Sequence, residues 1–172
     1  MRYVVNRIQL ATAGLFGAWL AHDLEELATM SDSSRMLMRR LPGWLPVPAS
    51  LRDHGLTDRY VATGIATVGV VVAAAAVRGY RTQGRSTFYQ NALLGFGLHG
   101  FGHIGLSLLV GGYASGVATS PTVVIPFWLW TARTLDQAGV RNRRSIPVAL
   151  TLTAVSIAGG HLAAYLITKN QP

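Results

Sequence analysis

The sequence predicts an all-α protein, a polytopic membrane bundle of about five transmembrane helices, and three observations lead to this fold class. Charged residues make up 13% of the 172-residue chain, whereas soluble domains carry roughly 25%. The charges are clustered along the chain, and the mean hydropathy is +0.33. Between the clusters lie apolar stretches near the about 20 residues that a helix needs to cross a bilayer. We expect residues 1–172 to form one transmembrane helical domain.

The first predicted span covers about residues 4–30. A cleaved signal peptide is the alternative, but no small-x-small cleavage site directly follows the apolar run. Residues 31–57 are more polar and contain three prolines around Trp44. Basic and apolar residues mix in this segment, which is typical of chain lying on a membrane surface. We therefore expect an interfacial loop at about 31–57.

Four further spans are predicted at about residues 58–77, 86–110, 120–135 and 146–168. The third span of the chain, 86–110, is rich in glycine, which allows neighbouring helix backbones to approach closely in lipid. In the fourth span Pro121 suits the first turn, and Pro126 is expected to kink the helix. The first, third and fifth spans then run in the same direction.

The distribution of basic residues predicts how the bundle is oriented. Nine arginines fall on the side of the N-terminus, against five arginines and one lysine on the other side. The positive-inside rule then favours a cytoplasmic N-terminus in a bacterial-type plasma membrane. The net charge of +8 suits anionic lipid headgroups. No nucleic-acid-binding motif is present, so we expect a lipid bilayer as partner and no nucleic acid.

The chemistry begins with the sequence HDLEE at residues 22–26. In a helix His22, Glu25 and Glu26 share one face, while Asp23 points about a quarter-turn away and is kept as an alternate or supporting acid. Each acid near the bilayer centre costs about 2.5–3.5 kcal/mol unless a partner or a cation compensates. The alternative is a helix end at interfacial water, where carboxylates bind nothing.

Three more histidines fall late in spans that run in the same direction as the first. His99 and His103 are four residues apart, so their imidazoles lie on adjacent turns, and His161 follows in the last span. Alone, His161 is expected to be a hydrogen-bonded core residue. Together these residues predict one intramembrane metal site near a single level of the bundle, with His22, Glu25, Glu26, His99, His103 and His161 as ligands.

The absence of cysteine leaves nitrogen and oxygen ligands, which suit zinc, iron or manganese, as one ion or two. With zinc, Glu25 or Glu26 could act as catalytic base in the hydrolysis of a lipid. With two irons the same ligands could oxidise a hydrophobic substrate. We therefore expect a metal-dependent membrane enzyme acting on a lipid or other hydrophobic molecule. Three alternatives remain open: a small transporter, a proton- or cation-handling protein, and a structural or accessory protein. A homodimer is also considered.

The ordered motifs resemble a known family, the HXXEE-motif membrane proteins. HDLEE supplies the naming motif, and the resemblance covers about residues 21–164. Its remaining parts are Asn91, His99 and His103, the Ser120-Pro121 helix start with Pro126, and His161. Thr122 departs from the glycine that family members commonly show after this proline. The resemblance implies a multi-span membrane protein with a His/Glu polar core, and it implies no particular activity.

Overall fold

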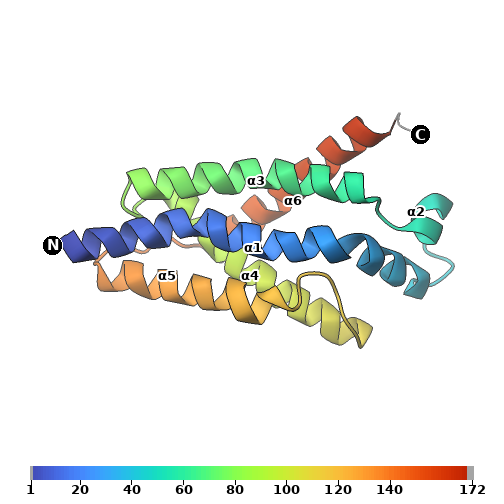
Figure 1. Cartoon of the computed structure of the whole chain (residues 1–172), viewed down its shortest axis with the longest axis horizontal. Coiled ribbons are helices and arrows are strands. Elements are labelled where there is room, and N and C mark those ends of the chain that lie inside the picture. The colour runs from blue at the N-terminus through green and yellow to red at the C-terminus, as the bar shows by residue number, and fades with distance from the viewer. Residues whose placement is uncertain (1, 170–172) are drawn as a thin grey trace.

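The structure, a computed structural model, describes residues 2–169, with side chains from Arg7 onward, so residue 1 and residues 170–172 of the expected domain lie outside it. Figure 1 shows a helical bundle in which α1, α4 and α6 run in one direction while α3 and α5 return. This alternation agrees with the predicted directions of the spans. The helices are α1 (Arg2–Arg40), α2 (Ala49–His54), α3 (Asp58–Arg81), α4 (Thr87–Val110), η1 (Ser120–Val124), α5 (Ile125–Gln137) and α6 (Ile146–Thr168).

Three helices of the described chain, α3, α4 and α6, are long and apolar enough to cross a membrane. The five predicted spans are therefore not confirmed as a count, although helices occur at all five places. The fourth predicted span consists of the π-helical turn η1 followed by α5, which has 13 residues. Within η1, the Thr122 hydroxyl donates to the carbonyl of Ala118 at 2.7 Å, so the residue that departs from the family pattern fits the turn.

The α1 helix is longer than predicted, because it runs through HDLEE and ends at Arg40 instead of near residue 30. Residues 31–40 of the expected interfacial loop are thus helical. Polar residues mark the end of an apolar span, but they do not terminate a helix. The first residue in this region that does so is Pro42. Beyond α1 the chain folds back, and Ser34 Oγ accepts a hydrogen bond from the backbone N–H of Leu56 at 2.8 Å.

Glycines on α4 explain how its neighbours come close. A Cβ atom at Gly95 would lie 2.4 Å from Thr153 Oγ1 of α6, and one at Gly97 would lie 2.5 Å from the Trp128 ring of α5. Contacts this short are not tolerated, so small residues at these positions let α5 and α6 lie against α4. The first half of α4 is therefore buried, and the histidines that follow it are held against α1.

Candidate metal centre

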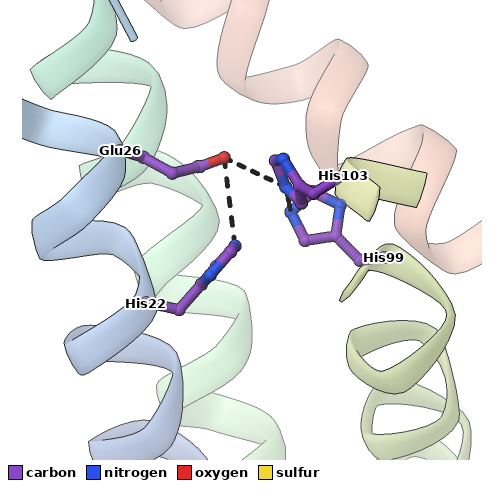
Figure 2. Close-up of side chains that lie close together, drawn as sticks. All are labelled: His22, Glu26, His99 and His103. Carbon is purple, nitrogen blue, oxygen red and sulfur yellow. Dashed lines mark hydrogen bonds and ion pairs between the residues drawn. The ribbon is translucent and has the colours of Figure 1, made fainter. Parts of the chain in front are cut away.

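Two pairs of side chains face each other across the bundle. His22 and Glu26 lie one turn apart on α1, and His99 and His103 lie one turn apart on α4 (Figure 2). His103 Nε2 lies 2.8 Å from His99 Nε2 and 3.1 Å from Glu26 Oε1. His22 Nε2 lies 3.9 Å from the same Glu26 oxygen. One ligand atom from each of the four residues lies within 4.8 Å of all the others.

His22 and Glu26 are buried and the two α4 histidines are partly buried, and part of the group's hydrogen-bonding capacity is unused. The His22 side chain has no exposed surface, and Glu26 is 4% exposed. Among the described residues, four buried side-chain nitrogen or oxygen atoms have no hydrogen-bond partner, and two of them are His22 Nε2 and Glu26 Oε1. A buried polar atom without a partner costs about 1–3 kcal/mol, so two such atoms facing one point indicate a place built for a ligand.

The spacing of the four groups fits a metal ion. Nitrogen and oxygen ligands bind zinc at about 2.0–2.2 Å, so four of them in tetrahedral order lie roughly 3.4 Å apart. The three separations of 2.8, 3.1 and 3.9 Å bracket that value. The remaining separations lie within 4.8 Å, so side-chain shifts that draw the four groups together would complete the coordination. Three imidazoles and one carboxylate suit zinc or iron.

Beside this group lies a cavity of about 240 Å³. Its walls come from α1, α3, α4 and α6, and they are mostly apolar, with Val68, Val72 and Ile157 among the lining residues. Asp23 and Glu26 line the cavity as well, together with His99 and His103. The candidate metal ligands therefore form one polar wall of an otherwise apolar chamber.

Glu25, one of the six predicted ligands, points away from the group. Its carboxylate accepts hydrogen bonds from the backbone N–H groups of Ala118 and Thr119, at 3.0 and 2.7 Å, and from the Thr119 hydroxyl at 2.5 Å. The Tyr113 phenol also donates to it. Partial burial is the main cause of a raised pKa of Tyr113, and the hydrogen bond to the Glu25 carboxylate is the next. The phenol therefore keeps its proton at neutral pH. Glu25 thus anchors the loop 111–119 to α1.

The structure does not bring His161 into the group either. The Tyr60 hydroxyl lies 3.0 Å from His161 Nδ1 and 3.2 Å from the carbonyl oxygen of the same residue. Both residues line the cavity away from the four-residue group. The hydrogen bond agrees with the role expected for His161 alone, but the side chain is exposed and does not lie in the core. Asp23 is 4% exposed and lies on the cavity wall, outside the set of close ligand atoms.

Comparison with known proteins agrees with these motifs. A family profile described as a protein of unknown function with HXXEE motif matches residues 13–131. The chain belongs to the HXXEE family. The match contains HDLEE, His99 and His103 and ends before His161. No curated protein and no solved structure shows significant similarity to the chain.

The HXXEE motif therefore divides into two parts in this structure. Its histidine and its last glutamate, His22 and Glu26, face α4, whereas its first glutamate, Glu25, faces the loop 111–119. Sequence reasoning missed the residues of that loop, of which Ser115 and Thr119 contact the imidazoles directly. Neither residue type is a typical metal ligand or catalytic group, and both stand in a short loop between helices, so the sequence contains no signal that would single them out.

Proposed function

We propose that this HXXEE-family protein binds one divalent cation through His22, Glu26, His99 and His103. One observation carries the proposal: two buried ligand atoms without partners, His22 Nε2 and Glu26 Oε1, face the imidazoles of α4. A second contact adds support, because His103 Nδ1 lies 2.5 Å from the carbonyl oxygen of Ser115. A carbonyl only accepts, so neutral His103 carries its proton on Nδ1 and turns the Nε2 lone pair toward Glu26.

A cation relieves the contacts that this arrangement creates. The lone pair of His103 Nε2 faces a carboxylate oxygen at 3.1 Å and another imidazole nitrogen at 2.8 Å. The His103 nitrogen and the Glu26 oxygen are then two acceptors 3.1 Å apart, and they repel each other unless a positive charge lies between them. Zinc or iron suits this donor set. Such an ion would act as a Lewis acid toward a carbonyl or phosphoryl oxygen.

We further propose that the protein is an enzyme acting on a lipid or another hydrophobic substrate. The apolar lining of the cavity favours a hydrocarbon part of the substrate, and the polar wall presents the candidate metal ligands to it. Asp23 and Glu26 both line the cavity; Asp23 lies outside the ligand set and could exchange a proton with a molecule bound there, while Glu26 would act through the oxygen that is not bound to the cation. Glu25 is held by four donors, and Glu26 is therefore the better candidate for the catalytic glutamate.

Elemental analysis of protein purified without chelator tests the metal site. We expect about one equivalent of zinc or iron per chain, lost in His99→Ala. Wild-type protein without bound metal, and without affinity for added zinc or iron, would mean that the group shares a proton instead.

Activity needs a separate measurement. Metal-loaded protein in nanodiscs would be incubated with total membrane lipid, and mass spectrometry would follow the loss of individual lipids. We expect turnover that depends on metal and is abolished in Glu26→Gln, with protein stripped by chelator as control. Cation flux into liposomes without any lipid turnover would favour the transport function over the enzyme.

The orientation in the membrane is also a proposal, with the N-terminus on the cytoplasmic side. Ser50 and Arg141 are both exposed and lie at opposite ends of the bundle, Ser50 within α2 and Arg141 in the segment before α6. Because the chain has no cysteine, Ser50→Cys and Arg141→Cys each introduce one label site. An impermeant thiol reagent applied from outside intact cells should label only Ser50→Cys. Labelling of both from outside would contradict the proposed membrane crossing.

A further inference from the structure

We infer that the segment 115–119, together with Glu25, is a positioning device that holds His22 and His103 in the tautomers that turn both Nε2 atoms toward Glu26. The inference rests on the proposed metal site and goes beyond it, because it assigns a role to the first glutamate of the HXXEE motif and to a loop. These residues act through the imidazoles and do not touch the cation.

The His103 side of the device is a backbone contact. The Ser115 carbonyl oxygen lies 2.5 Å from His103 Nδ1, and a carbonyl oxygen can only accept. A neutral imidazole has one N–H group, so the proton stays on Nδ1 and the lone pair on Nε2. The Ser115 hydroxyl is itself hydrogen-bonded to Thr29 of α1 at 2.8 Å, which fixes the carbonyl to the helix that carries His22.

The His22 side is a chain of three groups. The Thr119 hydroxyl lies 2.5 Å from Glu25 Oε2 and 2.7 Å from His22 Nδ1. A hydroxyl has one proton, and the Glu25 carboxylate, which also accepts from two backbone N–H groups, takes it. The hydroxyl oxygen must then accept from His22 Nδ1–H. The lone pair of His22 is again on Nε2, the atom that faces Glu26.

Gly116 lets the loop reach both rings. Its φ of +80° lies in the left-handed region that favours glycine. A Cβ atom there would lie 2.6 Å from His103 Nδ1 and 2.8 Å from His22 Cε1. The backbone of the loop is therefore packed directly against both imidazoles, and any larger residue would push it off them. Three residues of one short loop, Ser115, Gly116 and Thr119, thus contact the same two rings.

In metal sites, a ligating histidine usually donates its second N–H to a carbonyl or to a carboxylate, and removal of that partner costs about 10–100-fold in metal affinity. His103 has the carbonyl form of this support. His22 has the carboxylate form with a threonine hydroxyl inserted. This explains how Glu25 contributes to the site although its carboxylate points away from the other four predicted ligands on α1 and α4.

The tautomers can be read in the full-length protein before any metal is added. In protein labelled with ¹⁵N-histidine, in micelles at pH 8, long-range nitrogen–proton correlation distinguishes an imidazole protonated at Nδ1 from one protonated at Nε2. We expect His22 and His103 to be protonated at Nδ1, with assignment by His22→Gln and His103→Gln. Observation of the Nε2–H tautomer for both residues in the wild type would overturn the inference, whatever the protein binds.

A matched pair of variants tests the hydroxyl. Thr119→Val keeps the shape of the side chain and removes the hydrogen bond, whereas Thr119→Ser keeps the hydroxyl. Zinc affinity is expected to fall about 10–100-fold in Thr119→Val and to recover in Thr119→Ser, with the His22 tautomer mixed only in the valine variant. Helical content by circular dichroism would show that both variants are folded.

The outcomes separate this inference from the proposed function. Zinc binding in the wild type that is unchanged in Thr119→Val would refute the positioning role and leave the metal site intact. If the wild type binds no zinc or iron, the metal site fails, and the tautomers of the wild type still decide whether the loop orients the two rings. If Thr119→Val does not fold, the wild-type tautomers again decide.

Discussion

Two polar groups lie on α4 about two turns apart, one buried and one partly buried, and they differ in how completely the protein satisfies their hydrogen-bonding atoms. The first is Gln90 with Asn91, each 1% exposed. The second is His99 with His103, which face His22 and Glu26 of α1. Both groups interrupt an apolar helix, and Asn91, His99 and His103, but not Gln90, were singled out from the sequence. Only the second has the properties of a ligand site.

The amides of the first group are fully paired within the protein. Gln90 Nε2 donates to the carbonyls of Gly84 and Arg141, at 2.9 and 3.1 Å, and its oxygen accepts from the backbone N–H of Arg143. Asn91 Nδ2 donates to two carbonyls in the same way, and its oxygen accepts from the N–H of Ser145. The segment 141–145 leads into α6, and the two amides bind its backbone N–H and carbonyl groups. Their role is therefore structural.

The second group is paired on one side only. Each of His22 and His103 uses Nδ1 in a hydrogen bond to the loop 115–119, while the Nε2 atoms and Glu26 Oε1 face one another. The comparison teaches that burial of a polar residue in a helix does not by itself indicate function. What distinguishes the two groups is whether donors and acceptors are matched.

The largest expected effect is the loss of metal in His103→Ala. Removing one of four ligands should lower zinc affinity by more than 100-fold, beyond what the loss of a supporting partner costs. Titration calorimetry with the purified protein measures it. The control is His54→Ala, since His54 lies in the exposed part of the chain near α2. If His103→Ala binds as much metal as the wild type, the histidine group is not the metal site that distinguishes it from the amide group.

Metal removal should have the next largest effect, and only the histidine group should respond. At free zinc of 100 times Kd, binding stabilises the folded state by about 2.7 kcal/mol. A chelator should therefore lower the free energy of unfolding of the wild type by that amount. It should lower that of Gln90→Leu equally, because separate sites are additive, and leave His103→Ala unchanged. Equal responses in all three proteins would contradict a zinc site at His103.

Gln90→Leu should destabilise the protein by about 2 kcal/mol, because it leaves two buried backbone carbonyls and one N–H group without their side-chain partner. Denaturant unfolding in mixed micelles measures the loss. Gln137→Leu is the matched control, since Gln137 is exposed at the end of α5 and should change stability by less than about 0.5 kcal/mol. Reduced zinc affinity in folded Gln90→Leu would show that the amide group also supports the metal site.

The smallest effect is expected for His161→Ala. His161 is hydrogen-bonded to Tyr60 and lies outside the close ligand set, so zinc affinity should stay within about threefold of the wild type. A neutral hydrogen bond contributes roughly 0.5–1.5 kcal/mol to stability, and Tyr60→Phe should reproduce the loss. Release of the metal from His161→Ala would restore His161 as the ligand that the sequence predicted.

Much of the fold follows from local patterns in the chain. Helices occur at every predicted span, and the predicted starts of the helices at about 58, 86, 120 and 146 lie within one residue of the observed starts. These boundaries are marked by Thr57, Ser86, Pro121 and Pro147, whose preferences are local. The end of α1 was missed by ten residues, because a change of polarity was taken as the end of a helix that only Pro42 terminates.

The sequence by itself determined the helical class, the family, and the four-residue spacings that bring His22 onto one face with Glu26 and His99 onto one face with His103. These depend on the 3.6-residue period of a helix, which acts between neighbours along the chain. Tertiary structure alone decided that Glu26 and not Glu25 faces α4, that His161 pairs with Tyr60, and that the loop 115–119 lies behind both imidazoles. The physical reason is that the direction of a carboxylate or an imidazole depends on its hydrogen-bond donors and acceptors. The partners of Glu25 and His22 come from Ala118 and Thr119, more than ninety positions along the chain, and no local pattern specifies them.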